Sequence, residues 1–247
     1  MIAVDLSKTL IIDIETVPQY ADYHEMDEKW QKLWDKKAAS FIRNMPEPQP
    51  TPDELYFQKS GIFAEFGKVI CISCGYFVPL PDSDDAYGFR IKSFAGKHEN
   101  LLLGAFSELL NNSFNQYHHF LCGHNAREFD FPFIARRMLI RNIQLPRLLD
   151  VSGKKPWETK WLIDTMDMWR FGDFKNYTSL SLMAEALGVP TPKDDISGEQ
   201  VPYVFYKEDN LERIKTYCQK DVLATGRLLQ RLLQKPMIQD SNVKIVA

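Results

Sequence analysis

Two acidic residues end the first strongly apolar run of this 247-residue chain, in the stretch Leu10-Ile-Ile-Asp-Ile-Glu-Thr16. The pattern predicts a β-strand, and alternation along a strand places Asp13 and Glu15 on one face. At about 4 Å and an effective dielectric of about 20, two such like charges repel by about 4 kcal/mol. The pair therefore requires protonation, a basic partner or a divalent cation, unless it is simply a solvated strand end.

Three residues farther along the chain extend this acidic chemistry. Asp130 opens an expected helix that carries Pro132 in its first turn. Taken alone, Asp130 is best interpreted as an ordinary helix N-cap. Tyr217 and Asp221 are four residues apart, so they lie one above the other on a helix, at the edge of its apolar stripe. An aspartate there is unfavourable unless it is paired or binds a cation.

Alternating apolar patterns predict the elements that position these residues. The expected strands are 10–16, 68–78, 86–94, 118–123 and 162–164, and the expected helices are about 99–111, 130–142, 178–187 and 210–234. The turn-rich linker 79–85 makes 68–78 and 86–94 an antiparallel pair, and Thr178 is the expected cap of its helix. The order of elements predicts one α/β domain over residues 1–247.

Residues 20–62 are predicted to form a helical insertion between two strands of that sheet. Trp30 and Trp34 recur at helical spacing within about 27–44, and core packing is preferred over base stacking as their role. A proline-rich connector follows, and Thr51-Pro-Asp-Glu54 is typical of a capping box that opens a short second helix.

Composition narrows the classes of protein that the chain can represent. The net charge of −3 argues against a protein that coats nucleic acid broadly, but it permits an enzyme that grips a strand end. No apolar run approaches the ~20 residues of a membrane span, and the N-terminus lacks signal-peptide features. The cysteines do not suggest a disulfide framework, and Cys71 and Cys74 are interpreted as core residues. We expect a cytoplasmic protein with no membrane partner.

An aromatic segment within residues 143–177 has two interpretations. Trp169, Phe171, Phe174 and Tyr177 lie among Arg170 and Lys175. Such a mixture can stack bases and hold phosphates, or it can cover a core.

The acidic set, Asp13-x-Glu15, Asp130 and Tyr217-x-x-x-Asp221, resembles the DEDD superfamily of 3′–5′ exonucleases in its tyrosine subgroup (DEDDy). Residues 65–72 and 217–225 look like the proofreading exonuclease domain of family-B DNA polymerases, and the chain is similar to stand-alone predicted exonucleases related to that domain. The resemblance covers most of residues 8–234. It implies a ribonuclease-H-like α/β fold, with a mixed five-stranded sheet flanked by helices.

The resemblance also implies a metal-dependent mechanism with two Mg²⁺ or Mn²⁺ ions, the cations that oxygen ligands select. Two such ions about 3.5–4 Å apart stabilise the attacking water and the leaving 3′ oxygen. By the resemblance, Asp13 bridges the ions, Glu15 and Asp221 hold the ion on the water side, and Asp130 supports the other. Tyr217 orients the water, and its free pKa near ~10 leaves deprotonation to the metal.

The expected substrate is a single-stranded nucleic-acid 3′ end, with DNA favoured over RNA by the polymerase resemblance. Thr16, through its backbone, and the side chains of Asn125 and Phe129 match positions near the terminal nucleotide, although core packing is preferred for Phe129. Arg136, Arg137 and Arg141 follow Asp130 and either track phosphates or, as preferred, form a solvated helix face.

Two alternatives remain open. One is an RNA-processing exoribonuclease of the same fold, and the other is a non-catalytic ribonuclease-H-like module that binds nucleic acid. The presence of all five key side chains speaks against the second. No protein partner is indicated by the sequence.

Overall fold

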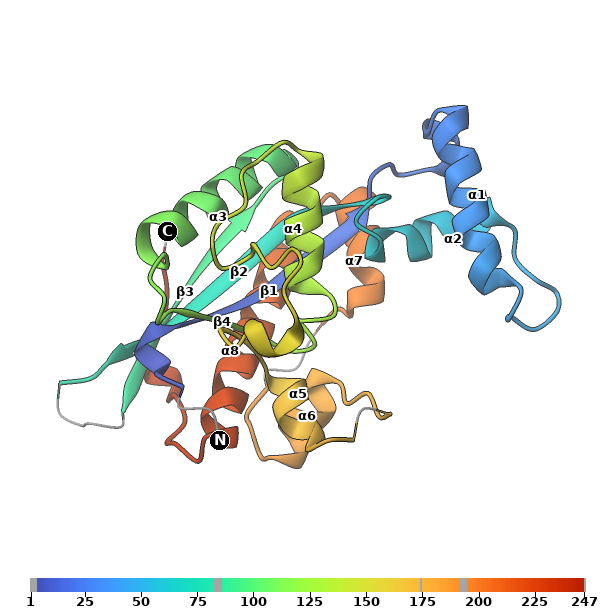
Figure 1. Cartoon of the computed structure of the whole chain (residues 1–247). Coiled ribbons are helices and arrows are strands. Elements are labelled where there is room, and N and C mark those ends of the chain that lie inside the picture. Colours follow the sequence, from blue (N-terminus) through green and yellow to red (C-terminus); the bar gives the residue numbers. More distant parts are fainter. Residues whose placement is uncertain (1–3, 82–85, 174, 192–194, 247) are drawn as a thin grey trace.

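A six-stranded mixed sheet of order β5-β4-β1-β2-β3-β6 forms the centre of the computed structural model, which describes residues 4–81, 86–173, 175–191 and 195–246 (Figure 1). The strands are β1 (Thr9–Pro18), β2 (Gly67–Pro79), β3 (Tyr87–Ala95), β4 (Phe120–Gly123), β5 (Leu162–Asp164) and β6 (Val243–Ile245). β1, β2 and β3 pair antiparallel, whereas β4, β5 and β6 each join a neighbour in parallel. The predicted strands correspond to β1–β5, and the short β6 adds a sixth at the edge.

Helices cover both faces of the sheet. On one face lie α3 (Glu99–Ser113) and α4 (Asp130–Ile140); on the other lie α7 (Val201–Tyr206) and α8 (Leu211–Leu232) (Figure 1). Ile12 and Ile14 pack into the core under α3 and α4, whereas Ile11 packs with residues of α8. β1 therefore alternates between two cores, and this alternation turns Asp13 and Glu15 toward α8.

Three short elements differ from the sequence expectations. α6 (Leu180–Ala186) is capped by Ser179, whose Oγ accepts the Leu182 amide at 3.3 Å, so the Thr178 cap was wrong. α5 (Thr165–Arg170) and α7 were not predicted, because one helical turn or two gives little periodicity. Within the described ranges no helix has both the length and the apolarity needed to cross a membrane. Residues 82–85 of the expected linker 79–85 lie outside those ranges, as does Phe174.

The segment of residues 20–62 lies between β1 and β2, as predicted, and contains α1 (Glu28–Ile42) and α2 (Pro52–Lys59). Figure 1 shows these two helices standing beside the sheet. They share a small core around Trp34, which is fully buried and donates from its indole N–H to the Pro52 carbonyl at 2.7 Å. Core packing is therefore confirmed for Trp34, whereas Trp30 is 40% exposed.

A buried ion pair joins the start of β2 to α3 and α4. Arg137, 2% exposed, donates to both Glu99 oxygens at 2.8 and 2.6 Å, and Arg141 adds a third bond at 2.6 Å. Glu99 also accepts the Val69 amide at 2.8 Å. Burial raises the pKa of Glu99, but the bonds from Arg137, Val69 and Arg141 outweigh it and lower that pKa. Both sequence interpretations of Arg137, as a phosphate contact or a solvated residue, were wrong.

We predict that Glu99→Gln lowers the free energy of unfolding by about 3–5 kcal/mol, because it leaves a buried guanidinium without its counter-charge. The exposed Arg136→Ala on the same helix is the control and is expected to change stability by less than about 0.5 kcal/mol. Chemical denaturation measures both. Equal stability of Glu99→Gln and the wild type would show that the pair does not stabilise the fold.

Candidate active site

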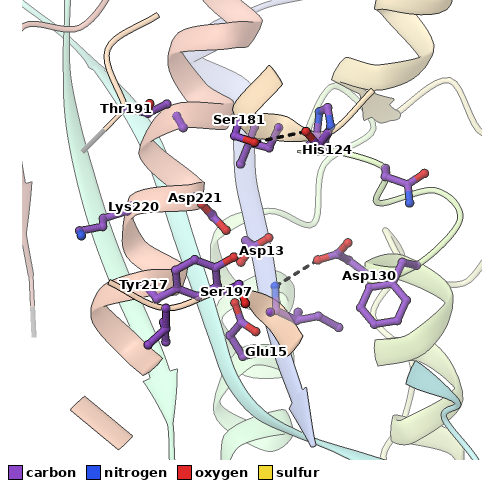
Figure 2. Close-up of a pocket in the computed structure, with 18 of the residues that line it drawn as sticks. Asp13, Glu15, His124, Asp130, Ser181, Thr191, Ser197, Tyr217, Lys220 and Asp221 are labelled. Carbon is purple, nitrogen blue, oxygen red and sulfur yellow. Dashed lines mark hydrogen bonds between the residues drawn. The ribbon is translucent and has the colours of Figure 1, made fainter. Parts of the chain in front are cut away.

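Four of the predicted residues meet where β1 crosses α8. Asp13 and Glu15 extend from β1 toward the helix, and Figure 2 shows the side chains of Tyr217 and Asp221 pointing toward them. Opposite Glu15, the β1–β2 register shifts: Glu15 pairs with Cys71 and Thr16 pairs with Val69, so β2 carries one extra residue. Such a bulge increases the local twist, and here it lies directly beside the acidic pair.

Asp130 approaches the same place from α4, on the other side of β1 (Figure 2). Its Oδ1 accepts the backbone N–H of Ile14 at 3.1 Å, across 116 residues of sequence. This amide faces the side of β1 on which pairing with β4 extends only from Thr9 to Ile11. The N-cap interpretation of Asp130 was wrong, since Asp130 is the first residue of α4 and caps it through no side-chain bond.

The five predicted catalytic residues line one cavity of about 660 Å³. Asn125 and Phe129 line it as well, so the structure brings seven of the eight predicted site residues together. Thr16 is not among the lining residues. Ile62, from the segment between β1 and β2, also lines the cavity, as do Ile196, Ser197 and Gly198 from the loop before α7, which sequence reasoning had not assigned to the site.

Burial and repulsion between like charges raise the pKa of three acidic side chains at this site, Asp13, Glu15 and Asp130. Burial contributes most to the raised pKa of Asp13, followed by the carboxylates of Asp221, Asp130 and Glu15. Burial also contributes most to the raised pKa of Glu15, followed by the charges of Asp221, the Cys71 thiol and Asp130. Burial also raises the pKa of Asp130 to about 7, against the opposing bond from the Ile14 amide. Without a counter-charge, burial and repulsion therefore favour the neutral forms of these three groups.

The site fits a divalent cation. Asp13 Oδ2 is buried, and among the described residues it has no hydrogen-bond partner. A ligand oxygen of Asp13, one of Glu15 and the sulfur of Cys218 all lie within 4.8 Å of one another. Hard divalent cations prefer carboxylate oxygens, and a cation would offset both the repulsion and the unsatisfied acceptor.

Cys218 is a residue that sequence reasoning missed. It was assigned to the apolar stripe of the long helix, and it is indeed fully buried, but its sulfur lies 3.4 Å from the Asp13 carbonyl oxygen. Its position three residues before Asp221 places both on neighbouring parts of one helix surface, which is the signal that could have revealed it.

Asp164, at the end of β5, was also missed. Its carboxylate accepts the amides of Asn125, Arg127 and Met166, each at 2.9 Å. Asn125 has a φ of 57°, a left-handed conformation that Asn tolerates better than most residues. Asp164 thus fixes the loop that follows β4 and leads into Asp130. The sequence shows only an aspartate at the end of a short strand, a pattern too common to signal this role.

The architecture and the acidic cavity together define a ribonuclease-H-like α/β enzyme. Over 91% of its length, the chain is similar to the family B DNA polymerase from the hyperthermophilic archaeon Pyrobaculum calidifontis, with a TM-score of 0.52 and 16% identity. At that identity the likeness concerns the fold, and the chain spans only 24% of the polymerase. No curated protein gives a significant match.

Residues 62–236 match the family of predicted 3′–5′ exonucleases related to the exonuclease domain of PolB. The chain belongs to this family, and it is a 3′–5′ exonuclease. The expected family and fold are therefore confirmed.

The raised carboxyl pKa values predict how stability depends on pH when cations are removed with EDTA. The folded state binds more protons than the unfolded state between about pH 4 and pH 7 or above, so these groups make stability fall as pH rises. Asp13→Asn removes one such group. We compare the melting temperature of Asp13→Asn with that of the wild type at each pH. We expect the variant's melting temperature minus the wild-type value to be more positive at about pH 8 than at about pH 5. The same difference at both pH values would contradict the assigned shift.

Proposed function

We propose that the chain shortens single-stranded nucleic acid from its 3′ end by metal-dependent hydrolysis of the phosphodiester bond, with DNA favoured over RNA. One observation carries this proposal: Asp13, Glu15, Asp130, Asp221 and Tyr217 line a single cavity in which Asp13 Oδ2 is buried and unsatisfied. The preference for DNA rests on the similarity to a DNA polymerase alone.

The four carboxylates would hold two Mg²⁺ or Mn²⁺ ions, which supply positive charge to stabilise the attacking water and the leaving 3′ oxygen. Asp13 lies between two other carboxylates, because Asp221 approaches it from α8 and Asp130 approaches it from α4 (Figure 2). In Asp130 the two oxygens have separate tasks. Oδ1 is engaged by the Ile14 amide, which fixes the side chain and leaves Oδ2 to face a ligand.

Tyr217 has the role of positioning the attacking water. Its phenol extends from α8 toward Asp13 in Figure 2, and it lines the cavity with the acids. A neutral phenol can donate one hydrogen bond and accept another, which suits it to orient a water molecule without removing its proton.

The terminal nucleotide is proposed to lie against Asn125 and Phe129. Asn125 Oδ1 is buried and, within the described chain, lacks a partner, so it is available to a donor on the substrate. Phe129 serves both interpretations, because it packs on the main core and on Phe133, at 5.4 Å between rings, while lining the cavity. The backbone contact of Thr16 remains a proposal.

We predict that 5′-labelled single-stranded DNA is shortened to a ladder of products with Mg²⁺ or Mn²⁺, and that Asp13→Ala or Asp221→Ala reduces the rate more than about 100-fold. That limit follows because even groups that merely orient a metal ligand contribute about 10–100-fold. Asp150→Ala, at an exposed position outside the cavity, is the matched control and should retain the wild-type rate.

RNA of the same sequence is tested in parallel. Faster shortening of RNA would replace the DNA preference with the exoribonuclease alternative. Binding of both strands without shortening by either metal would refute the proposed reaction.

We predict that Tyr217→Phe lowers turnover by about 10–100-fold while metal affinity stays near the wild-type value. The phenol orients the water, and loss of a group that positions a metal ligand typically costs about 10–100-fold in activity. Single-turnover kinetics and calorimetric titration with Mn²⁺ separate the two effects. Loss of Mn²⁺ binding in Tyr217→Phe would contradict the role assigned to the phenol.

A further inference from the structure

Two thiols lie beneath the acidic pair, on the core side of the cavity. Cys71 and Cys218 are both fully buried and pack in one apolar cluster between β2, α7 and α8. Cys71 is the cross-strand partner of Glu15, so their side chains share a face of the sheet. The Cys218 thiol donates to the Asp13 carbonyl oxygen at 3.4 Å.

Asp13, Glu15 and Cys218 form a mixed set of two hard ligands and one soft ligand. The ligand atoms of Asp13, Glu15 and Cys218 are within 4.8 Å of one another. A tetrahedral zinc ion with bonds of about 2.0–2.3 Å holds its ligand atoms about 3.3–3.8 Å apart. Side-chain rotations that move these atoms by about 1 Å would therefore close the set around one ion.

The softness of the ligands makes this set prefer other cations than the site of the proposed reaction does. Mg²⁺ and Mn²⁺ are satisfied by carboxylate and water oxygens and gain little from a thiol, whereas Zn²⁺ and Cd²⁺ bind thiolates strongly. The buried, unsatisfied Oδ2 of Asp13 supplies an acceptor that either kind of ion can use. The Cys218 thiol, in contrast, favours only the soft ions.

We propose that Asp13, Glu15 and Cys218 bind a thiophilic divalent cation such as Zn²⁺ or Cd²⁺ in competition with the hard cations of the proposed reaction. The Cys218 thiol releases its proton to solvent when it coordinates the ion. Competition follows because Asp13 and Glu15 belong to both ligand sets. Zn²⁺ is thus an inhibitor of the exonuclease, and this consequence rests on the proposed function.

Spectroscopy of the metal-free full-length chain tests the site without using activity. Titration with Cd²⁺ alone should produce a saturable thiolate-to-metal charge-transfer absorption at one equivalent. Cys218→Ala should weaken Cd²⁺ binding at least tenfold and reduce the absorption. The matched control is Cys74→Ala, because Cys74 is equally buried on β2 but packs into the core on the opposite face of the sheet. It should bind Cd²⁺ like the wild type.

A second measurement uses only the wild type and so does not depend on the folding of a variant. At half-saturating Cd²⁺, excess Mn²⁺ should reduce the charge-transfer absorption, because both ions require Asp13 and Glu15. The inference is overturned if no absorption develops, if it persists unchanged in Cys218→Ala, or if Mn²⁺ leaves it unaffected.

The two proposals can fail separately. Shortening of DNA with Mn²⁺ in a chain that shows no Cd²⁺ absorption would leave the function intact and remove the thiol site. The Cd²⁺ absorption in a chain that shortens no strand would support the thiol site and remove the function.

Discussion

The repulsion between carboxylates fixed on β1 is the constraint on which the site depends. Asp13 and Glu15 cannot turn away from each other, because strand alternation sends both toward α8 while Ile12 and Ile14 fill the opposite core. Asp221 adds a further negative charge, and burial weakens the screening by water. The fold holds these groups together at a cost in stability, and a cation turns the same arrangement into a favourable one.

The parallel strands explain why the remaining site residues arrive at this point. β1, β4 and β5 run in the same direction, so their carboxyl ends open at one edge, where ligands commonly bind in α/β sheets. β4 and β5 are short and stop while β1 continues. The loop after β4 can therefore lie beside the later part of β1. There Asp164 accepts a hydrogen bond from the loop backbone, and Asp130 accepts the Ile14 amide.

The sequence predicted the elements whose apolar pattern extends over many residues, and the site residues whose types and order match a known family. Asp13, Glu15, Tyr217 and Asp221 could be placed because each lies on an element with a strong apolar pattern. α5 and α7 could not, because short helices leave almost no periodic signal. Arg137 and Glu99 were missed for a different reason: their contact depends on how α3 and α4 pack, and separation by 38 residues leaves no local trace of it.

Helix geometry determines where Cys218 lies relative to Tyr217 and Asp221. At about 100° per residue, a helix that directs Tyr217 and Asp221 toward the cavity places residue 218 about 60° from Asp221 and toward β1. That position must be small and apolar to pack against the strand, and cysteine meets both needs. Only its sulfur distinguishes it from alanine there. The packing requirement and the metal binding that we propose at this position are thus separable.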